Sequence, residues 1–366
     1  MKLFKSLLVA PATLGLLAPL SATANEITVN DFNSVEEISN INPLLAGGEG
    51  LVDVSSHDGG FSETTAASFS IDSAIGAIDG DPTSEATTFD YQFNIGLSTS
   101  FTGEDSLDIA IDSGSVEKST TDNPMAFDTG AGLTVDGITY SFPVGGVSMI
   151  VGVDTDLSAA FTGACTYSAF TDYMSDCGTV NSLASAGNGF TAAGSYAFDS
   201  GFSLAAGVSG TADGVTATNA KGLLTKEGSD SYGIEAAYTA DSWGVAVGYV
   251  YDDNNTSAET TTWGINGNYS FDIADVSVGY ESEETSGTEK TGYFVGLTFP
   301  EVGPGSVSIG AATTGNYASN ATEYMIYEAS YSYTVNDGLT ITPGIFIEEK
   351  SGDDLTGIIV KSSFSF

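Results

Sequence analysis

Arginine is absent from this chain of 366 residues, and only eight lysines stand against 48 aspartates and glutamates, which gives a formal net charge of −40. Proteins that bind nucleic acid or an anionic membrane surface do so through lysine and arginine contacts to phosphate. The composition therefore argues against both partners. The acidic excess has two readings: it keeps exposed loops soluble, or it biases a pore toward cations.

Histidine occurs once, at His57, between Ser56 and Asp58 in an acidic stretch. A serine–histidine–aspartate triad would have to use this residue, on a segment that shows no rigid support. The sequence also contains no cysteine–histidine cluster suited to zinc and no phosphate-binding loop. We therefore expect a protein that is not an enzyme and needs no cofactor.

Long apolar runs are missing after the N-terminus, so helical membrane spans of about twenty residues are not expected. Residues 1–24 have the pattern of a secretory signal peptide, with Lys2 and Lys5 before an apolar stretch and Ala22-Thr23-Ala24 at its end. Cleavage between Ala24 and Asn25 is expected. The alternative, an uncleaved anchor, is disfavoured because two prolines break a short apolar stretch.

Apolar and polar residues alternate with a period of two from Phe89 onward, which indicates half-buried β-strands. Trp243 and Tyr251 bracket one apolar face, and Trp263 and Phe271 bracket another, as in the aromatic girdles of membrane barrels. About fourteen strands are clear, and weaker ones near residues 66–72 and 115–135 bring the count to about sixteen. The predicted fold is all-β: a transmembrane antiparallel β-barrel with an even count of about 16 strands, within a range of about 14–18. A soluble β-sandwich is the alternative.

The C-terminal strand carries its own signal. Ile358, Val360, Phe364 and Phe366 share one face of a strand that ends on an aromatic residue. A barrel can end this way, because lipid accepts one face and the first strand pairs with the backbone. The strand also resembles the signal that barrel-assembly machinery reads.

Three regions follow from these patterns: the signal peptide over 1–24, an acidic lead-in over 25–85, and the barrel over 86–366. The lead-in is expected to be a tether, a short helix or the first strand. Tight turns are expected at 199–201 and 241–242, and longer acidic loops at 252–261 and 281–290.

The polar faces of the predicted strands are the candidate lining of a pore. Carboxylates outnumber lysines there, which predicts a preference for cations. The candidate charges are Asp90, Asp108, Asp112, Glu235, Glu328 and Lys361. The same faces carry runs of small residues such as Gly244, Ala246 and Gly248, which either allow another segment to pack closely or form a wide, water-lined wall.

Cys165 and Cys177 are the only cysteines, and in an oxidising compartment this pair predicts a disulfide. The aromatic loop that they enclose either folds into or over the mouth of the pore, or is a rigid external loop without a role in transport. Two acidic stretches, 79–85 and 252–259, contain oxygen ligands suited to calcium, but neither has the spacing of a dedicated calcium loop. We therefore predict no specific metal site.

Several segments together resemble the major porins of cyanobacterial outer membranes, which are also described as iron-uptake porins and are related to carbohydrate-selective porins. The matching segments are the signal sequence, Ser98–Asp105, Tyr140–Gly145 and the ending Gly357–Phe366. Members of that family usually carry an S-layer-homology domain and a coiled coil before the barrel, and no such pattern occurs over 25–85.

The resemblance implies a passive diffusion channel in the cell outer membrane, in contact with lipid and passing ions and small hydrophilic solutes. A homotrimer is expected by analogy with porins. Two other functions remain open at this point. One is an acidic structural or adhesive surface protein that uses the barrel as an anchor, and the other is a soluble, secreted, calcium-binding β-protein.

Overall fold

The computed structural model describes residues 65–80, 87–115, 125, 127, 130, 132–184, 189–210, 228–253 and 258–366, which all belong to one compact unit. The proposed signal peptide, its cleavage site at Ala24 and Asn25, and the start of the lead-in lie outside these residues. Within the described ranges no helix combines the length and apolar character of a membrane span.

Nearly every regular element is a β-strand, and the strands form one antiparallel sheet of seventeen. One of them, β14 (Tyr317–Ala318), is only two residues long and pairs with the extended end of β12, which leaves sixteen strands for the barrel. The first eight are β1 (Thr65–Asp79), β2 (Thr88–Thr99), β3 (Ser106–Gly114), β4 (Thr134–Val144), β5 (Val147–Val153), β6 (Phe190–Ala197), β7 (Phe202–Gly210) and β8 (Asp230–Thr239). The others are β9 (Trp243–Asp253), β10 (Thr260–Ser270), β11 (Asp275–Thr285), β12 (Thr288–Val302), β13 (Gly305–Thr313), β15 (Met325–Asn336), β16 (Leu339–Glu348) and β17 (Leu355–Ser365).

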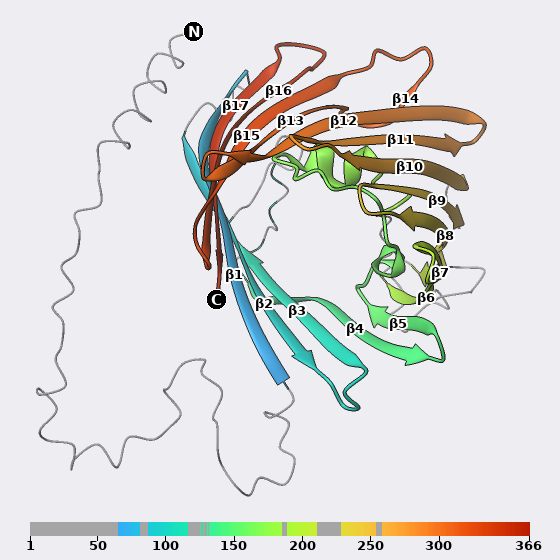
Figure 1. Cartoon of the computed structure of the whole chain (residues 1–366). Coiled ribbons are helices and arrows are strands. Elements are labelled where there is room, and N and C mark those ends of the chain that lie inside the picture. The colour runs from blue at the N-terminus through green and yellow to red at the C-terminus, as the bar shows by residue number, and fades with distance from the viewer. Residues whose placement is uncertain are drawn as a thin grey trace, which may run out of the picture. The chain divides into compact units, whose positions relative to one another are not determined.

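The sheet closes on itself, because β1 pairs with both β2 and β17 (Figure 1). The ladder between β1 and β17 runs from Ser70 opposite Ser365 to Asp79 opposite Thr356. The backbone at Phe366 continues it by exchanging two hydrogen bonds with Phe69. The predicted all-β barrel with about 16 strands is confirmed, and its closure removes the free sheet edges.

The barrel begins earlier in the chain than predicted. β1 starts at Thr65, inside the stretch assigned to a lead-in, so the boundary at residue 86 was too late. The lead-in prediction did allow a first strand there, and the weak strand near 66–72 is β1. The other weak strand, predicted near 115–135, lies mostly outside the described residues; of those described there, Thr134 and Val135 form the start of β4.

Two kinds of side chain alternate along the strands. Bulky apolar residues face outward and are well exposed, as Val247, Val278 and Ile345 show at 45%, 48% and 50%. Their neighbours in the sequence are small or polar and lie inside, as Ala246 and Ser277 do at 0% and 2%. An apolar exterior around a polar or small-residue interior is the arrangement of a barrel that spans a membrane.

The two ends of the barrel differ in their connections. Short turns at 145–146, 199–201, 241–242, 303–304 and 337–338 lie at the end where β1 begins, and the tight turns predicted at 199–201 and 241–242 are confirmed. Most connections at the other end are longer. The acidic loop predicted at 281–290 is wrong: β11 and β12 run on and are joined by Ser286 and Gly287, whose φ values of 54° and 75° fit a two-residue hairpin turn.

Candidate functional site

The connection between β5 and β6 enters the barrel. Its residues Asp154–Ala184 are called the inner segment here and contain two short 3-10 elements, η5 (Leu157–Ala160) and η6 (Asp172–Gly178). Figure 1 shows it as a green ribbon inside the ring of strands. Leu157, Phe170 and Met174 are at most 2% exposed because they pack against the inner wall. The prediction that this loop folds into the pore is confirmed.

Glycines on the inner wall make this packing possible. A Cβ atom at Gly279 would lie 1.8 Å from the carbonyl oxygen of Cys177, and one at Gly344 would lie 2.5 Å from the Phe170 ring. A Cβ at Gly310 would meet the Met174 sulfur at 2.5 Å, and one at Gly248 would meet the Ser182 carbonyl oxygen at 2.3 Å. The small-residue wall therefore serves close packing of a second segment, as one of the two sequence readings predicted.

The predicted disulfide is present: Cys165 and Cys177 are joined by an S–S bond of 2.00 Å. Cys177 is fully buried and lies in the left-handed backbone region together with Asp176 and Gly178, at φ values of 56°, 48° and 67°. This strained turn aims the sulfur back toward Cys165. The segment between the two cysteines includes Phe170 and Met174, whose buried side chains pack against the wall.

Glu235 and Glu328 point into the barrel as predicted, but the prediction that they charge the open bore was wrong. They are only 2% and 3% exposed, because the inner segment covers them. Glu235 accepts hydrogen bonds from the backbone N–H groups of Thr162 (2.7 Å) and Gly163 (2.8 Å). Hydrogen bonds to an ionised carboxylate contribute about 1.5–3 kcal/mol each, so these contacts hold the segment in place.

Glu328 accepts four hydrogen bonds from the disulfide ring. The donors are the backbone N–H groups of Phe170 and Thr171, both at 2.8 Å, the Thr171 hydroxyl at 2.6 Å and the Tyr167 hydroxyl at 3.0 Å. Burial, and then the Glu328 charge, raise the pKa of Tyr167, so its hydroxyl stays protonated and remains a donor.

Glu281 plays the same part at the end of the inner segment and was missed, because it lies at the start of the loop predicted over 281–290. It accepts bonds from the backbone N–H groups of Asn181 (3.0 Å) and Ser182 (2.9 Å) and is 1% exposed. Glu281 lies two residues after the inward-facing Gly279 on the same strand, so the alternation of the strand would have placed it on the inner face.

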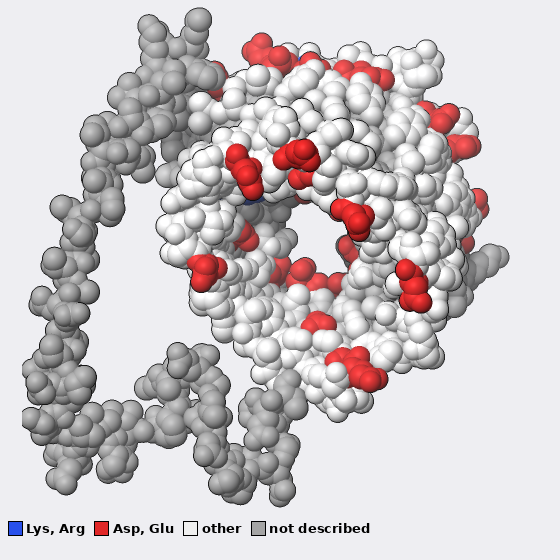
Figure 2. Space-filling model, in the orientation of Figure 1, with Lys and Arg blue, Asp and Glu red and all other residues white. Residues whose placement is uncertain are grey.

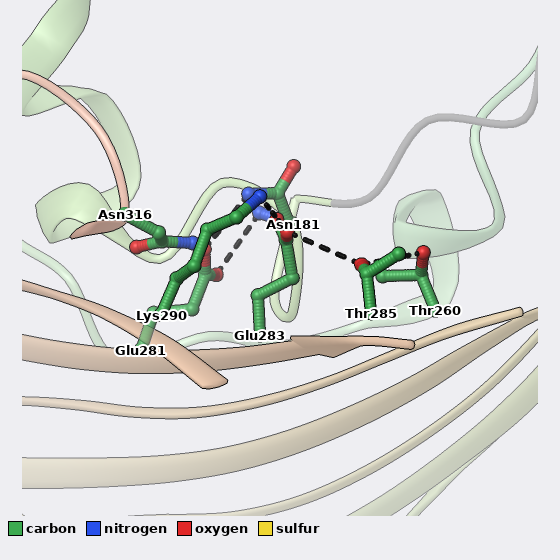
Figure 3. A network of polar contacts seen from close by, with 7 residues as sticks. All are labelled: Asn181, Thr260, Glu281, Glu283, Thr285, Lys290 and Asn316. Atoms are coloured by element: carbon green, nitrogen blue, oxygen red, sulfur yellow. Dashed lines mark hydrogen bonds and ion pairs between the residues drawn. The ribbon is translucent and has the colours of Figure 1, made fainter. Parts of the chain in front are cut away.

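Figure 3 shows the surroundings of Glu281 at the end of the barrel with the longer loops. The side-chain amide of Asn316, in the connection from β13 to β15, donates to Glu281 at 2.8 Å. Nearby, Lys290 forms an ion pair of 2.9 Å with Glu283. Glu281 thus joins the inner segment to a second loop, and Lys290 has an acidic partner.

Lys361 lies inside the barrel, as predicted, but its side chain contacts the inner segment and not the open bore. Its ammonium donates to the Phe170 carbonyl oxygen at 3.2 Å and sits 5.6 Å from the centre of the Phe170 ring. The Phe170 backbone therefore meets a carboxylate through its N–H and a cation through its carbonyl oxygen.

The remaining predicted charges, Asp90, Asp108 and Asp112, lie on β2 and β3. Their hydrogen bonds come from the same wall: Asp112 accepts from the Thr134 hydroxyl at 2.7 Å, and Asp108 from the Ser106 hydroxyl at 2.8 Å. Figure 2 shows an open hole through the barrel with acidic side chains around it. Within the described residues, no three His, Cys, Asp or Glu side chains are grouped to hold a metal ion.

A closed, lipid-compatible barrel around an open bore, narrowed by a folded-in segment, defines a channel-forming membrane protein. A family described as Gram-negative porin matches residues 50–345, and the chain belongs to this family. Both the family and the fold are those of channels, not enzymes.

Solved structures agree on the fold. Pseudomonas putida OprB, in a high-pH structure, has a TM-score of 0.67 at 10% identity over 83% of this chain and 95% of its own. A triple mutant of the Rhodopseudomonas blastica porin has a TM-score of 0.52 at 12% identity over 82% of this chain and 100% of its own. No curated protein matches the sequence.

Proposed function

We propose that this porin is a passive diffusion channel of the outer membrane, which passes small hydrophilic solutes and favours cations. The observation that carries the proposal is an open bore with acidic side chains around it, while the only described lysine on the β17 wall, Lys361, is bound to the inner segment. Fixed carboxylates at a narrow passage raise the local cation concentration and lower that of anions.

Several exposed or partly exposed carboxylates support this preference. Asp90 and Asp108 are partly exposed on the wall, and Asp172 is exposed on the inner segment. Lys290 and Lys350 form ion pairs with Glu283 and Glu348, so they add little positive field. The bore is thus built for ions and small polar molecules. Neutral sugars and iron-bearing cations, the solutes that the family resemblance implies, both fall within that class.

A planar-bilayer measurement tests the proposal. In a tenfold gradient of potassium chloride, the reversal potential should have the sign of potassium permeation. Absence of any conductance would reject the channel, and a reversal potential of the chloride sign would reject the cation preference alone. Liposome swelling with neutral sugars then measures whether uncharged solutes pass.

In the cell, the channel would reach the outer membrane through its two terminal segments. The signal peptide over 1–24 would direct export, the β17 strand would be read by the barrel-assembly machinery, and three copies would form the working unit. Heat-modifiable migration of envelope fractions on gels tests insertion, and mass measurement in detergent tests the trimer.

A further inference from the structure

Three glutamates from separate strands hold the inner segment in the same way. Glu235 on β8, Glu281 on β11 and Glu328 on β15, called the anchor glutamates here, each accept hydrogen bonds from two consecutive backbone N–H groups. The donor pairs are residues 162 and 163, 181 and 182, and 170 and 171 respectively. Consecutive N–H groups that point at one anion form a concave anion site, here filled by a side chain of the same protein.

The three contacts are spread along the segment. The Glu235 contact precedes Cys165, the Glu328 contact lies within the disulfide ring, and the Glu281 contact follows Cys177. Each carboxylate is at most 3% exposed, so a permeating ion cannot approach it. These carboxylates bind backbone N–H groups of the inner segment and do not face the bore.

The wall behind the segment fixes the direction in which it can move. Gly279 and Gly344 have no room for even one additional carbon atom between the wall and the segment. A segment released from its anchors can therefore leave its place only toward the bore.

We propose that Glu235, Glu281 and Glu328 are positioning residues that set the open cross-section of the channel by holding the inner segment against the wall. This inference rests on the proposed channel function. On this proposal the three glutamates determine the size of the passage, and the exposed aspartates determine its ion selectivity.

The test compares single-channel conductance, reversal potential and the entry of neutral sugars of increasing size. The variants are Glu235→Gln, Glu281→Gln and Glu328→Gln, each of which removes the charge and replaces one of the two accepting oxygens with an NH2 donor. Mean conductance should fall about twofold with added flicker, and the largest sugars should be excluded. Glu328→Asp keeps the charge but shortens the reach, so it should give the same loss while the reversal potential stays unchanged.

Two matched controls separate position from charge. Asp108→Asn removes a wall carboxylate bonded to Ser106, and should shift the reversal potential while sugar entry stays normal. Glu348→Gln removes a buried glutamate paired with Lys350, and should leave the sugar size limit unchanged.

The outcomes are distinguishable. If the wild-type protein does not conduct, the channel function itself fails. If the wild type conducts and the anchor variants keep its conductance and sugar size limit, the positioning role is wrong. If none of the anchor variants yields a heat-modifiable barrel, the role is also wrong, because a positioning residue leaves the barrel intact.

Discussion

Phe366 and Phe69 exchange both of their backbone hydrogen bonds, each at 3.0 Å, and their rings stack with centroids 5.8 Å apart. Phe93 extends the stack from Phe69 at 6.4 Å. The final residue of the chain therefore joins the first strand at the seam where the barrel closes. A pair of stacked rings across two strands contributes about 0.5–1.5 kcal/mol beyond the area that it buries.

The seam gives the first prediction. Phe366→Ala and Phe69→Ala should each destabilise the refolded barrel, and the double variant should lose about 0.5–1.5 kcal/mol less than the sum. Denaturant unfolding in lipid vesicles measures the three losses. Phe271→Ala, which truncates an exposed ring outside the seam, is the matched control and should add independently to Phe69→Ala. Strict additivity of the seam pair would show that the rings do not interact.

A second prediction concerns pH and the turn between β2 and β3. The Asp105 carboxylate accepts hydrogen bonds from the Tyr140 hydroxyl at 2.7 Å and from the Thr102 backbone N–H at 2.8 Å. These bonds, of which the one from Tyr140 has the largest effect, lower the pKa of Asp105. A lowered folded-state pKa contributes stability that is present above the unfolded pKa of about 3.9 and is lost as the pH falls toward the folded value.

The stability gap between the wild type and Asp105→Asn should therefore be constant near neutral pH and shrink below a pH of about 4. Unfolding of the refolded barrel as a function of pH measures it. The stability difference between the wild type and Tyr140→Phe should be smaller and should depend on pH in the same way. The neighbouring Glu104→Gln should show no such pH-dependent difference from the wild type. A gap between the wild type and Asp105→Asn that persists unchanged at low pH would contradict the assignment.

The third prediction uses the close approach of the wall to the inner segment. Gly279→Ala places a methyl carbon only 1.8 Å from the Cys177 carbonyl oxygen, so the segment must move toward the bore. Overpacking of this kind costs about 1–3 kcal/mol, and the conductance should fall as well. Gly352→Ala is the control, because a Cβ there meets nothing within 4 Å. Equal conductance of the two variants would mean that the segment does not limit the passage.

The strands could be predicted where one face meets lipid and the other does not. Val278 and Tyr280 alternate with Ser277 and Gly279, and this contrast reveals both the strand and its inward face. The contrast disappears farther along β11, where Glu283 and Glu284 are both acidic. Strands that extend beyond the apolar belt are polar on both faces, which is why this stretch was read as a loop.

The inner segment could be predicted only in part. Its cysteines indicated the disulfide, and the small-residue wall indicated that another segment could pack there. Its position, however, depends on backbone N–H groups that bind carboxylates distant in the sequence. Thr162 and Glu235 are 73 residues apart, and Thr171 and Glu328 are 157 apart. Backbone donors leave no mark in the sequence, so no side-chain pattern could pair them.

The final prediction tests which face of the strands meets lipid. Val278 is 48% exposed on the outer face of β11. It lies two residues before Tyr280, whose ring packs against Trp263. A lysine near the middle of the apolar belt costs about 2–4 kcal/mol, and one near the interface costs about 0–1 kcal/mol. Val278→Lys should therefore destabilise the barrel in vesicles far more than Phe271→Lys, which changes an outward residue beside a short turn. Unfolding measurements in lipid give both values, and the difference should vanish in denaturing detergent, where neither lysine is forced into hydrocarbon. Equal costs in lipid would mean that Val278 faces water, and the outward apolar face would then need another explanation.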